Sequence, residues 1–294
     1  MSILINKDTK VLVQGITGRD GQFHTQRMIS FGTKILAGVT PGKGGQQIEF
    51  AENKAVPVFN SIAEAKKYFE FDASVIFVPA AFATDAIYEA IDEEIPLVVV
   101  ITEGIPVHDM LKINAYLKDK KTKLLGPNCP GILVPEEVKI GIIPHEYFKR
   151  GVIGVVSRSG TLTYEISYHI SQTKYGLSTI VGIGGDPIKG MDFIDILKLF
   201  NKDEETKGIV IIGEIGGMDE EEAARFVKKN VKKPVFGFIA GKTAPPEKRM
   251  GHAGAIIEQG KGTAQSKIEA FLSAGIEVFE EPQEIINLLE KINI

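Results

Sequence analysis

The chain has 294 residues, of which 44% are hydrophobic and 24% are charged; these values are close to the globular average and argue against a disordered or fibrous chain. This length predicts two compact domains, each large enough to bury a core. The formal net charge of -4 and the shortness of every apolar run argue against nucleic-acid and membrane partners, so we expect a cytoplasmic protein.

Short β-rich runs alternate with amphipathic stretches in the first half of the chain. The expected strands cover residues 10–14, 35–39, 74–78, 96–101 and 123–125, and the helical patterns include 84–93 and 109–118. This alternation is typical of βαβ units, and the nearly continuous apolar strands predict helices on both faces of a parallel sheet. We therefore predict a Rossmann-like domain over residues 1–128.

A loop-rich passage rich in glycine and proline spans residues 126–151 and predicts a domain boundary, which we place between residues 128 and 129. A second βαβ series is expected beyond it. Its strands lie near residues 152–156, 179–183, 208–212, 235–239 and 277–279, and its helices near 161–174, 193–201, 220–230, 263–274 and 282–291. This series predicts a flavodoxin-like parallel-sheet domain over residues 129–294.

The first expected strand runs into a glycine-rich loop. Its sequence is Gly15-Ile16-Thr17-Gly18-Arg19-Asp20-Gly21, and a helical pattern follows from residue 23 to 31. Glycines let the backbone approach a phosphate, and a helix N-terminus presents N–H groups to an anion. Because the spacing is not the dinucleotide fingerprint G-x-G-x-x-G, the loop is either a phosphate site or a plain strand-to-helix turn.

The end of the second expected strand narrows the choice of nucleotide. NAD-binding domains usually place a carboxylate there to hold the ribose hydroxyls, whereas this chain has Lys43 between glycines. A lysine attracts the extra phosphate of CoA or NADP, so these nucleotides fit better than NAD. The alternative is an ordinary solvated lysine.

The second half of the chain contains another candidate anion site. Ser159, Gly160 and Thr161 follow the expected strand 152–156 and stand at the start of a helix. Backbone amides and hydroxyls at a helix N-terminus can bind a phosphate, although simple helix capping explains a serine at this position equally well.

A glycine-flanked histidine follows the expected strand 235–239. His252 has little local cover, because its neighbours are Gly251 and Ala253. A neutral imidazole can act as a nucleophile when a carboxylate fixes its other nitrogen, and Glu214 at the end of the strand 208–212 is placed for that task. The alternative for Glu214 is an exposed loop glutamate. Histidine and cysteine nowhere have metal-ligand spacing, so we expect no metal site in the chain.

Five motifs together resemble the α-subunit family of succinate–CoA ligase, also called succinyl-CoA synthetase, and the resemblance extends over essentially the whole chain. The motifs occupy residues 39–45, 101–106, 126–131, 157–165 and 251–255. This family interconverts succinate, CoA and ATP or GTP with succinyl-CoA, ADP or GDP and phosphate. Its reaction passes through an acyl phosphate and a phosphohistidine.

The resemblance implies roles for individual residues. His252 matches the phosphorylated histidine, Glu214 matches its supporting glutamate, and Tyr164 matches a position associated with the acyl substrate. The CoA-binding positions are Thr17, Gly18, Arg19, Asp20, Lys43, Ile101, Thr102 and Glu103, and the positions that receive the phosphate are Ser159, Gly160 and Thr161. Arg19 and Asp20 depart from the usual family pattern, so their side-chain roles stay open.

The resemblance also implies a partner. The chain lacks a G-x-x-x-x-G-K-[ST] loop and a cluster of carboxylates for Mg²⁺, and in this family an ATP-grasp β subunit binds the magnesium nucleotide. The alternatives are a related malate–CoA or citrate–CoA ligase and a CoA-binding module without catalysis. ADP versus GDP and αβ versus α₂β₂ assembly stay open. We expect the lone Cys129 to be a core residue, because no activating base accompanies it.

Overall fold

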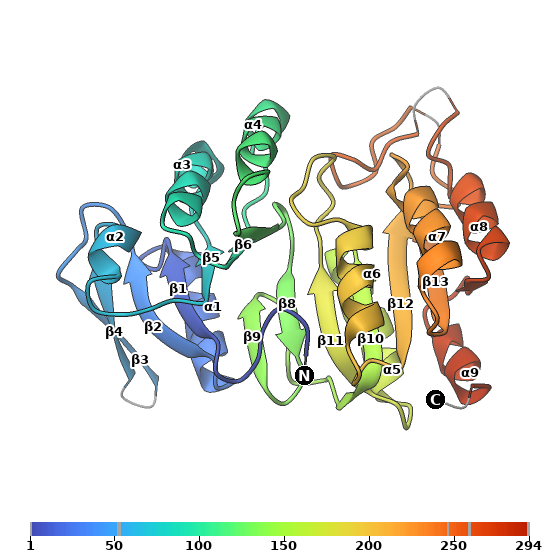
Figure 1. Cartoon of the computed structure of the whole chain (residues 1–294), viewed down its shortest axis with the longest axis horizontal. Helices are drawn as coiled ribbons and strands as arrows, with labels where there is room; N and C mark the ends of the chain where they lie inside the picture. Colours follow the sequence, from blue (N-terminus) through green and yellow to red (C-terminus); the bar gives the residue numbers. More distant parts are fainter. Residues whose placement is uncertain (1, 52–53, 246, 258–259, 293–294) are drawn as a thin grey trace.

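The computed structural model describes residues 2–51, 54–245, 247–257 and 260–292. Within these ranges, the chain forms two seven-stranded sheets that lie next to each other along the long axis of the molecule (Figure 1). Parallel pairing dominates both sheets, and helices pack on both. This arrangement confirms the predicted α/β class with a Rossmann-like sheet followed by a flavodoxin-like one.

The first sheet has the strand order β3-β4-β2-β1-β5-β6-β7, and its pairs are parallel except β3 with β4. Its elements are β1 Lys10–Gln14, α1 Arg19–Ser30, β2 Lys34–Val39, β3 Gln47–Phe50, β4 Lys54–Phe59, α2 Ile62–Ala65, β5 Ala73–Ile76, α3 Ala80–Asp92, β6 Leu97–Val100, α4 Val107–Leu117 and β7 Lys123–Leu125. The sequence did not predict β3, β4 and α2. Pro57 interrupts the apolar run of β4, and a proline argues against a strand.

The side chains of the first sheet alternate between two cores, as the twofold period of a strand requires. Leu12 of β1 packs in the cluster that contains Ala83 and Ile87 of α3. Its neighbours Val11 and Val13 point to the opposite face and join a cluster with Met28 of α1. Helices α2 to α4 therefore cover one face of this sheet, and α1 covers the other.

The second sheet has the strand order β14-β13-β12-β10-β11-β8-β9. Its elements are β8 Gly131–Val134, β9 Val138–Gly141, β10 Arg150–Ser157, α5 Gly160–Ser171, β11 Leu177–Gly182, α6 Phe193–Lys202, β12 Gly208–Glu214, α7 Asp219–Asn230, β13 Val235–Ala240, α8 Ala264–Ser273, β14 Glu277–Val278 and α9 Glu284–Glu290. Helices α5 and α9 contact each other on one face, and α6, α7 and α8 form a row on the other.

The passage predicted to be rich in loops contains a β-hairpin. Strands β8 and β9 pair antiparallel and extend the second sheet beyond β11. Gly131 and Gly141 face each other in this hairpin, and a Cβ built on Gly131 would lie 2.1 Å from the carbonyl oxygen of Ile140. The glycines that signalled a loop therefore permit a close approach of two strands.

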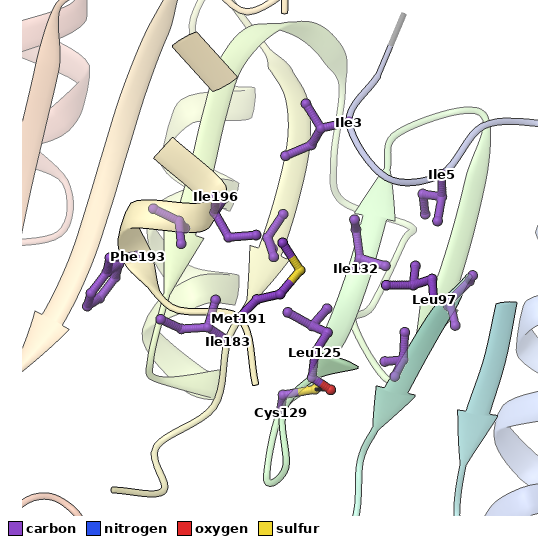
Figure 2. Close-up of a cluster of buried hydrophobic side chains, with 14 of the residues drawn as sticks. Ile3, Ile5, Leu97, Leu125, Cys129, Ile132, Ile183, Met191, Phe193 and Ile196 are labelled. Carbon is purple, nitrogen blue, oxygen red and sulfur yellow. Dashed lines mark hydrogen bonds between the residues drawn. The ribbon is translucent and has the colours of Figure 1, made fainter. Parts of the chain in front are cut away.

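The two sheets share one hydrophobic core. Figure 2 shows part of a buried cluster in which Leu97 of β6 and Ile132 of β8 lie in the same group as Met191 and Phe193 near the start of α6. Helix α1 also packs against β9, where the hydroxyl of Thr33 donates to the carbonyl oxygen of Lys139 at 2.7 Å. The division between residues 128 and 129 stays a prediction. No helix within the described ranges is both long and apolar enough to span a membrane.

Candidate active site

The carboxyl ends of the parallel strands in the second sheet carry the loops with the predicted catalytic and phosphate-binding residues. Ser159 follows β10, Glu214 is the last residue of β12, and His252 lies in the long loop after β13. These loops gather at the upper edge of the sheet in Figure 1. Ligands of open α/β sheets bind at this edge, so the topology brings together groups that are far apart in the sequence.

His252 and Glu214 are in direct contact. The Nδ1 atom of His252 lies 2.9 Å from each carboxylate oxygen of Glu214. A carboxylate only accepts hydrogen bonds, so Nδ1 carries the proton, and Nε2 keeps the lone pair when the ring is neutral. Glu214 is 7% exposed, whereas the side chain of His252 is 27% exposed. The carboxylate is shielded from water while the ring stays accessible.

Glycines let the loop of His252 dock closely on its neighbours. A Cβ built on Gly185 would lie 2.2 Å from Cγ of His252, and one built on Gly216 would lie 1.9 Å from the carbonyl oxygen of Gly254. The N–H of Gly254 donates to the carbonyl oxygen of Gly185 at 3.3 Å, and the N–H of Ala255 donates to that of His252 at 3.1 Å. The loop is thus fixed against the segments that follow β11 and β12.

The charges around His252 favour its protonated form. The hydrogen bond to Glu214 raises the pKa of the imidazole above its ordinary value, and burial opposes this effect. The charges of Glu214 and Glu103 raise the pKa further, whereas the charge of Arg158 lowers it. Since Glu103 belongs to the first domain, the loop after β6 lies within electrostatic reach of the histidine.

The start of α5 is a capped helix N-terminus. The hydroxyl of Ser159 accepts the N–H of Leu162 at 3.3 Å, and the N–H of Ser159 donates to the hydroxyl of Ser157 at 3.1 Å. Gly160 and Thr161 form the first turn, where backbone N–H groups lack partners within the helix. Capping therefore accounts for Ser159, and phosphate binding by these residues stays a prediction.

The glycine-rich loop of the first domain is a tight turn into α1. A Cβ built on Gly21 would lie 2.2 Å from the carbonyl oxygen of Gly15, so no larger residue fits there. The helix begins at Arg19, four residues earlier than predicted, and its N-cap Gly18 offers no side-chain cap. Gly18, Arg19 and Asp20 are all exposed. The exposed first turn of α1 is open to an anion, as expected for a phosphate loop.

A second loop lies beside the glycine-rich loop. The hydroxyl of Thr17 donates to that of Thr40 at 3.1 Å, which joins the turn after β1 to the segment after β2. Lys43 is exposed, and the backbone N–H groups on both sides of it donate to Oδ1 of Asn60 at 3.0 Å. Asn60 shapes the loop that presents Lys43. No sequence pattern indicated this role, because the preceding strand β4 was not predicted.

The remaining predicted CoA positions follow β6. The hydroxyl of Thr102 donates to the carbonyl oxygen of Val78 at 2.7 Å, and its own carbonyl oxygen accepts the N–H of Asn128 at 2.9 Å. Ile101 and Thr102 are half-buried, and Glu103 is exposed. These residues stand at the carboxyl edge of the first sheet together with the two loops described above. CoA contacts by them stay a prediction.

Cys129 and Tyr164 were also singled out in the sequence. Cys129 is buried in the shared core, its thiol donates to the carbonyl oxygen of Val100 at 3.2 Å, and burial raises the pKa of the thiol to about 12 (Figure 2). It is therefore the core residue that the sequence predicted. Burial also raises the pKa of Tyr164 to about 12, so its phenol is neutral at physiological pH. Its substrate contact stays a prediction.

An ion network behind Glu214 was not predicted. Arg158 Nη1 lies 3.0 Å from Oε1 of Glu220, and Lys267 Nζ contacts Glu220 and lies 2.9 Å from Oε2 of Glu221. The same Oε1 of Glu220 accepts the N–H of Glu214 at 3.2 Å. Arg158, Glu220 and Lys267 are almost completely buried. Acidic residues at the start of a helix are usually exposed, so the sequence pattern gives no indication of this network.

The described part of the chain contains no group of three or more histidine, cysteine, aspartate or glutamate side chains arranged to hold a metal ion.

Two protein families match separate parts of the chain. A CoA binding domain matches residues 6–104, and a CoA-ligase domain matches residues 156–276. The first match covers the glycine-rich loop and the loops of Lys43 and Glu103. The second covers Glu214 and His252.

Among solved structures, the chain is similar to ATP citrate lyase from Methanothrix soehngenii in complex with citrate and coenzyme A. The TM-score is 0.86 at 27% sequence identity, and the match covers 98% of this chain and 51% of the solved one. The chain therefore spans about half the length of that protein. The likeness supports the arrangement of the two sheets.

Curated relatives are closer in sequence. The succinate–CoA ligase (ADP-forming) subunit alpha of Staphylococcus aureus strain Mu50 is 57% identical over 97% of this chain and 93% of its own length. The subunit of the same name from Aquifex aeolicus strain VF5 is 57% identical over 99% of this chain and 95% of its own length. With such identity over nearly the whole of both sequences, the chain belongs to the family of succinate–CoA ligase (ADP-forming) alpha subunits and is part of a CoA ligase.

Proposed function

We propose that this chain is the subunit that binds CoA and carries the phosphoryl group in a succinate–CoA ligase. The enzyme interconverts succinate, CoA and ATP or GTP with succinyl-CoA, ADP or GDP and phosphate. The observation that carries the proposal is the contact between Nδ1 of His252 and both oxygens of Glu214 at 2.9 Å. The relatives are named as ADP-forming, which favours ADP as the nucleotide.

The chemistry assigned to His252 is a phosphoryl transfer through Nε2. In the direction of nucleotide synthesis, phosphate attacks succinyl-CoA, which gives succinyl phosphate and releases CoA as its thiol. The lone pair of Nε2 then attacks phosphorus, the bond from phosphorus to the acyl oxygen breaks, and succinate leaves as a carboxylate. Nδ1 keeps its proton and donates a hydrogen bond to Glu214, so the positive charge of the phosphorylated ring faces a carboxylate. Transfer to the nucleoside diphosphate restores the neutral ring.

The first turn of α5 is the proposed binding site for the phosphoryl group. Helix N-termini favour anions, because their first N–H groups are unpaired and the helix dipole is positive there. Ser159 caps the helix, and Gly160 and Thr161 form its first turn. Arg158, the residue before Ser159, is also in the ion network of Glu214, which ties this turn to the histidine site.

Coenzyme A is assigned to the carboxyl edge of the first sheet. The exposed first turn of α1, from Gly18 to Asp20, and the exposed ammonium group of Lys43 are suited to its phosphates. The CoA binding domain match over residues 6–104 supports this assignment. The charge of Glu103 raises the pKa of His252, so the end of this edge lies within electrostatic reach of the histidine. This supports a site in which the thioester and the imidazole meet.

The nucleotide half of the reaction is assigned to an ATP-grasp β subunit. The relatives are named as alpha subunits, and the chain matches about half of the solved ATP citrate lyase. Magnesium and the nucleotide then bind mainly to the partner. The free, buried Cys129 fits a reducing compartment such as the cytoplasm.

Two alternatives have less support. A citrate–CoA ligase is favoured by the likeness to ATP citrate lyase, but that protein is 27% identical, whereas the succinate–CoA ligase subunits are 57% identical. If the chain only bound CoA, the contact between His252 and Glu214 would have no role in its chemistry.

Labelling with radioactive ATP tests the proposal. The chain co-expressed with an ATP-grasp subunit should acquire phosphate that is labile to acid and stable to base, as expected for a phosphoramidate. His252→Asn should abolish the label and leave CoA binding intact, and Glu214→Gln should slow labelling by about 10²-fold. Unchanged rate and stoichiometry of labelling in His252→Asn would show that the assignment is wrong.

A further inference from the structure

Arg158 contacts Glu214 by charge and not by a hydrogen bond. Its Nε lies 3.5 Å from Oε1 of Glu214, and this buried atom has no hydrogen-bond partner in the described residues. The carboxylate oxygens of Glu214 instead both contact Nδ1 of His252. Glu214 therefore accepts its side-chain hydrogen bond from the histidine and interacts with the guanidinium through charge alone.

The opposite side of Arg158 is fixed. Its Nη1 donates to Glu220 at 3.0 Å and to the carbonyl oxygen of Gly216 at 3.2 Å. Burial alone would lower the pKa of the guanidinium, but the charges of Glu220 and Glu214 raise it, so Arg158 stays a cation. Lys267 contacts the second oxygen of Glu220. Arg158 is thus held in place independently of His252.

The buried network carries one uncompensated negative charge. Three carboxylates, those of Glu214, Glu220 and Glu221, face two cations, Arg158 and Lys267. Burying so many charges is weak evidence for a stabilising role, because apolar residues of similar volume often serve stability equally well. The excess negative charge reaches His252 through Glu214 and favours a positive ring, and Arg158 opposes this effect.

Other charged groups lie near the histidine on the elements that pack against it. They are Glu214 at the end of β12, Arg158 after β10, Glu103 after β6, Asp186 after β11 and Arg249 on the loop of the histidine itself. Asp186 accepts a hydrogen bond from Asn128 at 2.9 Å, and Arg249 donates to the carbonyl oxygen of His252 at 3.3 Å. Of the groups that alter the protonation of the ring, Arg158 is the cation that opposes Glu214 and Glu103.

We propose that Arg158, held by Glu220, is a positioning residue that offsets part of the charge of Glu214, so that a larger share of His252 stays neutral with Nε2 free to attack phosphorus. The proposal rests on the phosphohistidine function proposed above. Glu214 alone would favour an imidazolium, which has no lone pair on Nε2 and cannot accept a phosphoryl group. Arg158 leaves the orienting hydrogen bond intact and limits this protonation.

The proposal predicts opposite effects for two substitutions. Arg158→Met removes a cation and should raise the pKa of His252 by roughly one unit. Glu220→Gln removes a carboxylate, leaves the guanidinium to face Glu214 alone, and should lower that pKa. Arg158→Lys keeps the charge without the planar group and should lie between the wild type and Arg158→Met. A role limited to stability would not move the pKa in opposite directions.

The pKa is measured by NMR titration of the full chain with ¹³C-labelled histidine, in which the His252 signal is identified by its loss in His252→Asn. Arg150→Met is the matched control, because Arg150 begins the strand that Arg158 follows and forms ion pairs at the surface. It should leave the titration unchanged. Should Arg158→Met fail to fold, Glu220→Gln still shows in which direction the pKa of His252 moves. A pKa that rises or stays constant in Glu220→Gln would overturn the proposal.

A kinetic test separates this proposal from the function on which it rests. In the enzyme assembled with its partner, the rising limb of the pH profile for phosphorylation should move upward in Arg158→Met and downward in Glu220→Gln. At neutral pH, Arg158→Met should phosphorylate up to roughly tenfold more slowly. Label that appears on His252 with an unmoved profile in both variants would overturn the role of Arg158 alone. A complete lack of label in the wild type would overturn the proposed phosphohistidine function and, with it, the proposed role of Arg158.

Discussion

A side chain at residue 185 and the ring of His252 cannot occupy the same space. A Cβ built on Gly185 lies 2.2 Å from Cγ and 2.4 Å from Nδ1 of His252. The imidazole therefore packs directly against Gly185, and the absence of a side chain at this position lets Nδ1 reach Glu214. The position of the histidine depends on a residue that carries no functional group.

Replacing Gly185 with alanine should disrupt phosphorylation more than folding. The added methyl group meets the ring near its attachment point, so the ring has to turn and the contact between Nδ1 and Glu214 is lost. We expect labelling of the assembled enzyme by radioactive ATP to fall by about 10²-fold, since misplacement by about 1 Å has this effect in other enzymes. CoA affinity and circular dichroism serve as controls and should stay unchanged. Labelling at the wild-type rate would contradict the proposed seating of the ring.

The contact between His252 and Glu214 should stabilise the fold most at low pH. The pKa of His252 is raised in the folded chain by the hydrogen bond to Glu214, so folding favours the protonated ring. This contribution is fully present below the ordinary pKa of about 6.5 and is lost as the pH rises through the folded value. In urea unfolding, the difference in free energy between the wild type and Glu214→Gln should shrink from about pH 5.5 to about pH 8.5.

The control for this titration is Glu222→Gln, which removes an exposed carboxylate that forms a weak ion pair with Arg225 at 3.8 Å. Its effect should be small and nearly constant over the same range. A difference for Glu214→Gln that grows with pH would contradict the direction of the pKa shift.

Lys43 should recognise the extra phosphate of CoA. We expect Lys43→Ala to weaken CoA binding roughly tenfold, because a charge-assisted contact to phosphate is lost. The same substitution should leave the affinity for desphospho-CoA unchanged, which calorimetry can measure. Lys228→Ala, which removes an exposed lysine of α7, is the control. Tight binding of NAD with no binding of CoA would show that the first domain has been misassigned.

Cys129 should resist thiol reagents in the folded chain. With the pKa of its thiol raised to about 12, only about 10⁻⁴ of the thiol is ionised near pH 8, and the sulfur is buried. Alkylation followed by mass spectrometry should show slow modification in buffer and rapid modification in denaturant. Rapid modification in buffer would mean that the thiol becomes exposed and would reopen its role in thioester chemistry.

The sequence predicted several apolar strands and periodic helices with close to their observed bounds. Strands β1 and β7 have the predicted bounds, and α6 differs by one residue at its end. The hairpin of β8 and β9 was missed, because its strands have four residues each and begin or end in glycine. Such glycines indicate loops in a sequence and close strand contacts in a structure.

The candidate site was predictable where chain topology alone decides which residues meet. Glu214 ends a strand and His252 lies in the loop after the neighbouring strand, so parallel pairing brings both to the same edge of the sheet. The network of Arg158, Glu220 and Lys267 was not predictable, since it depends on the packing of α7 against α8 and on side-chain burial. No periodic pattern distinguishes the buried Glu220 and Glu221 from the exposed Glu222 in the same helix start.

The core shared by the two sheets fixes the loop of Glu103 relative to the loop of Gly185. Leu97, which precedes the first loop, and Phe193, which follows the second, belong to one buried cluster. In the proposed mechanism, the distance between the thioester and the imidazole therefore depends on how this core packs. A chimaera that joins one half to the other half of a distant relative could keep every site residue and still change this distance.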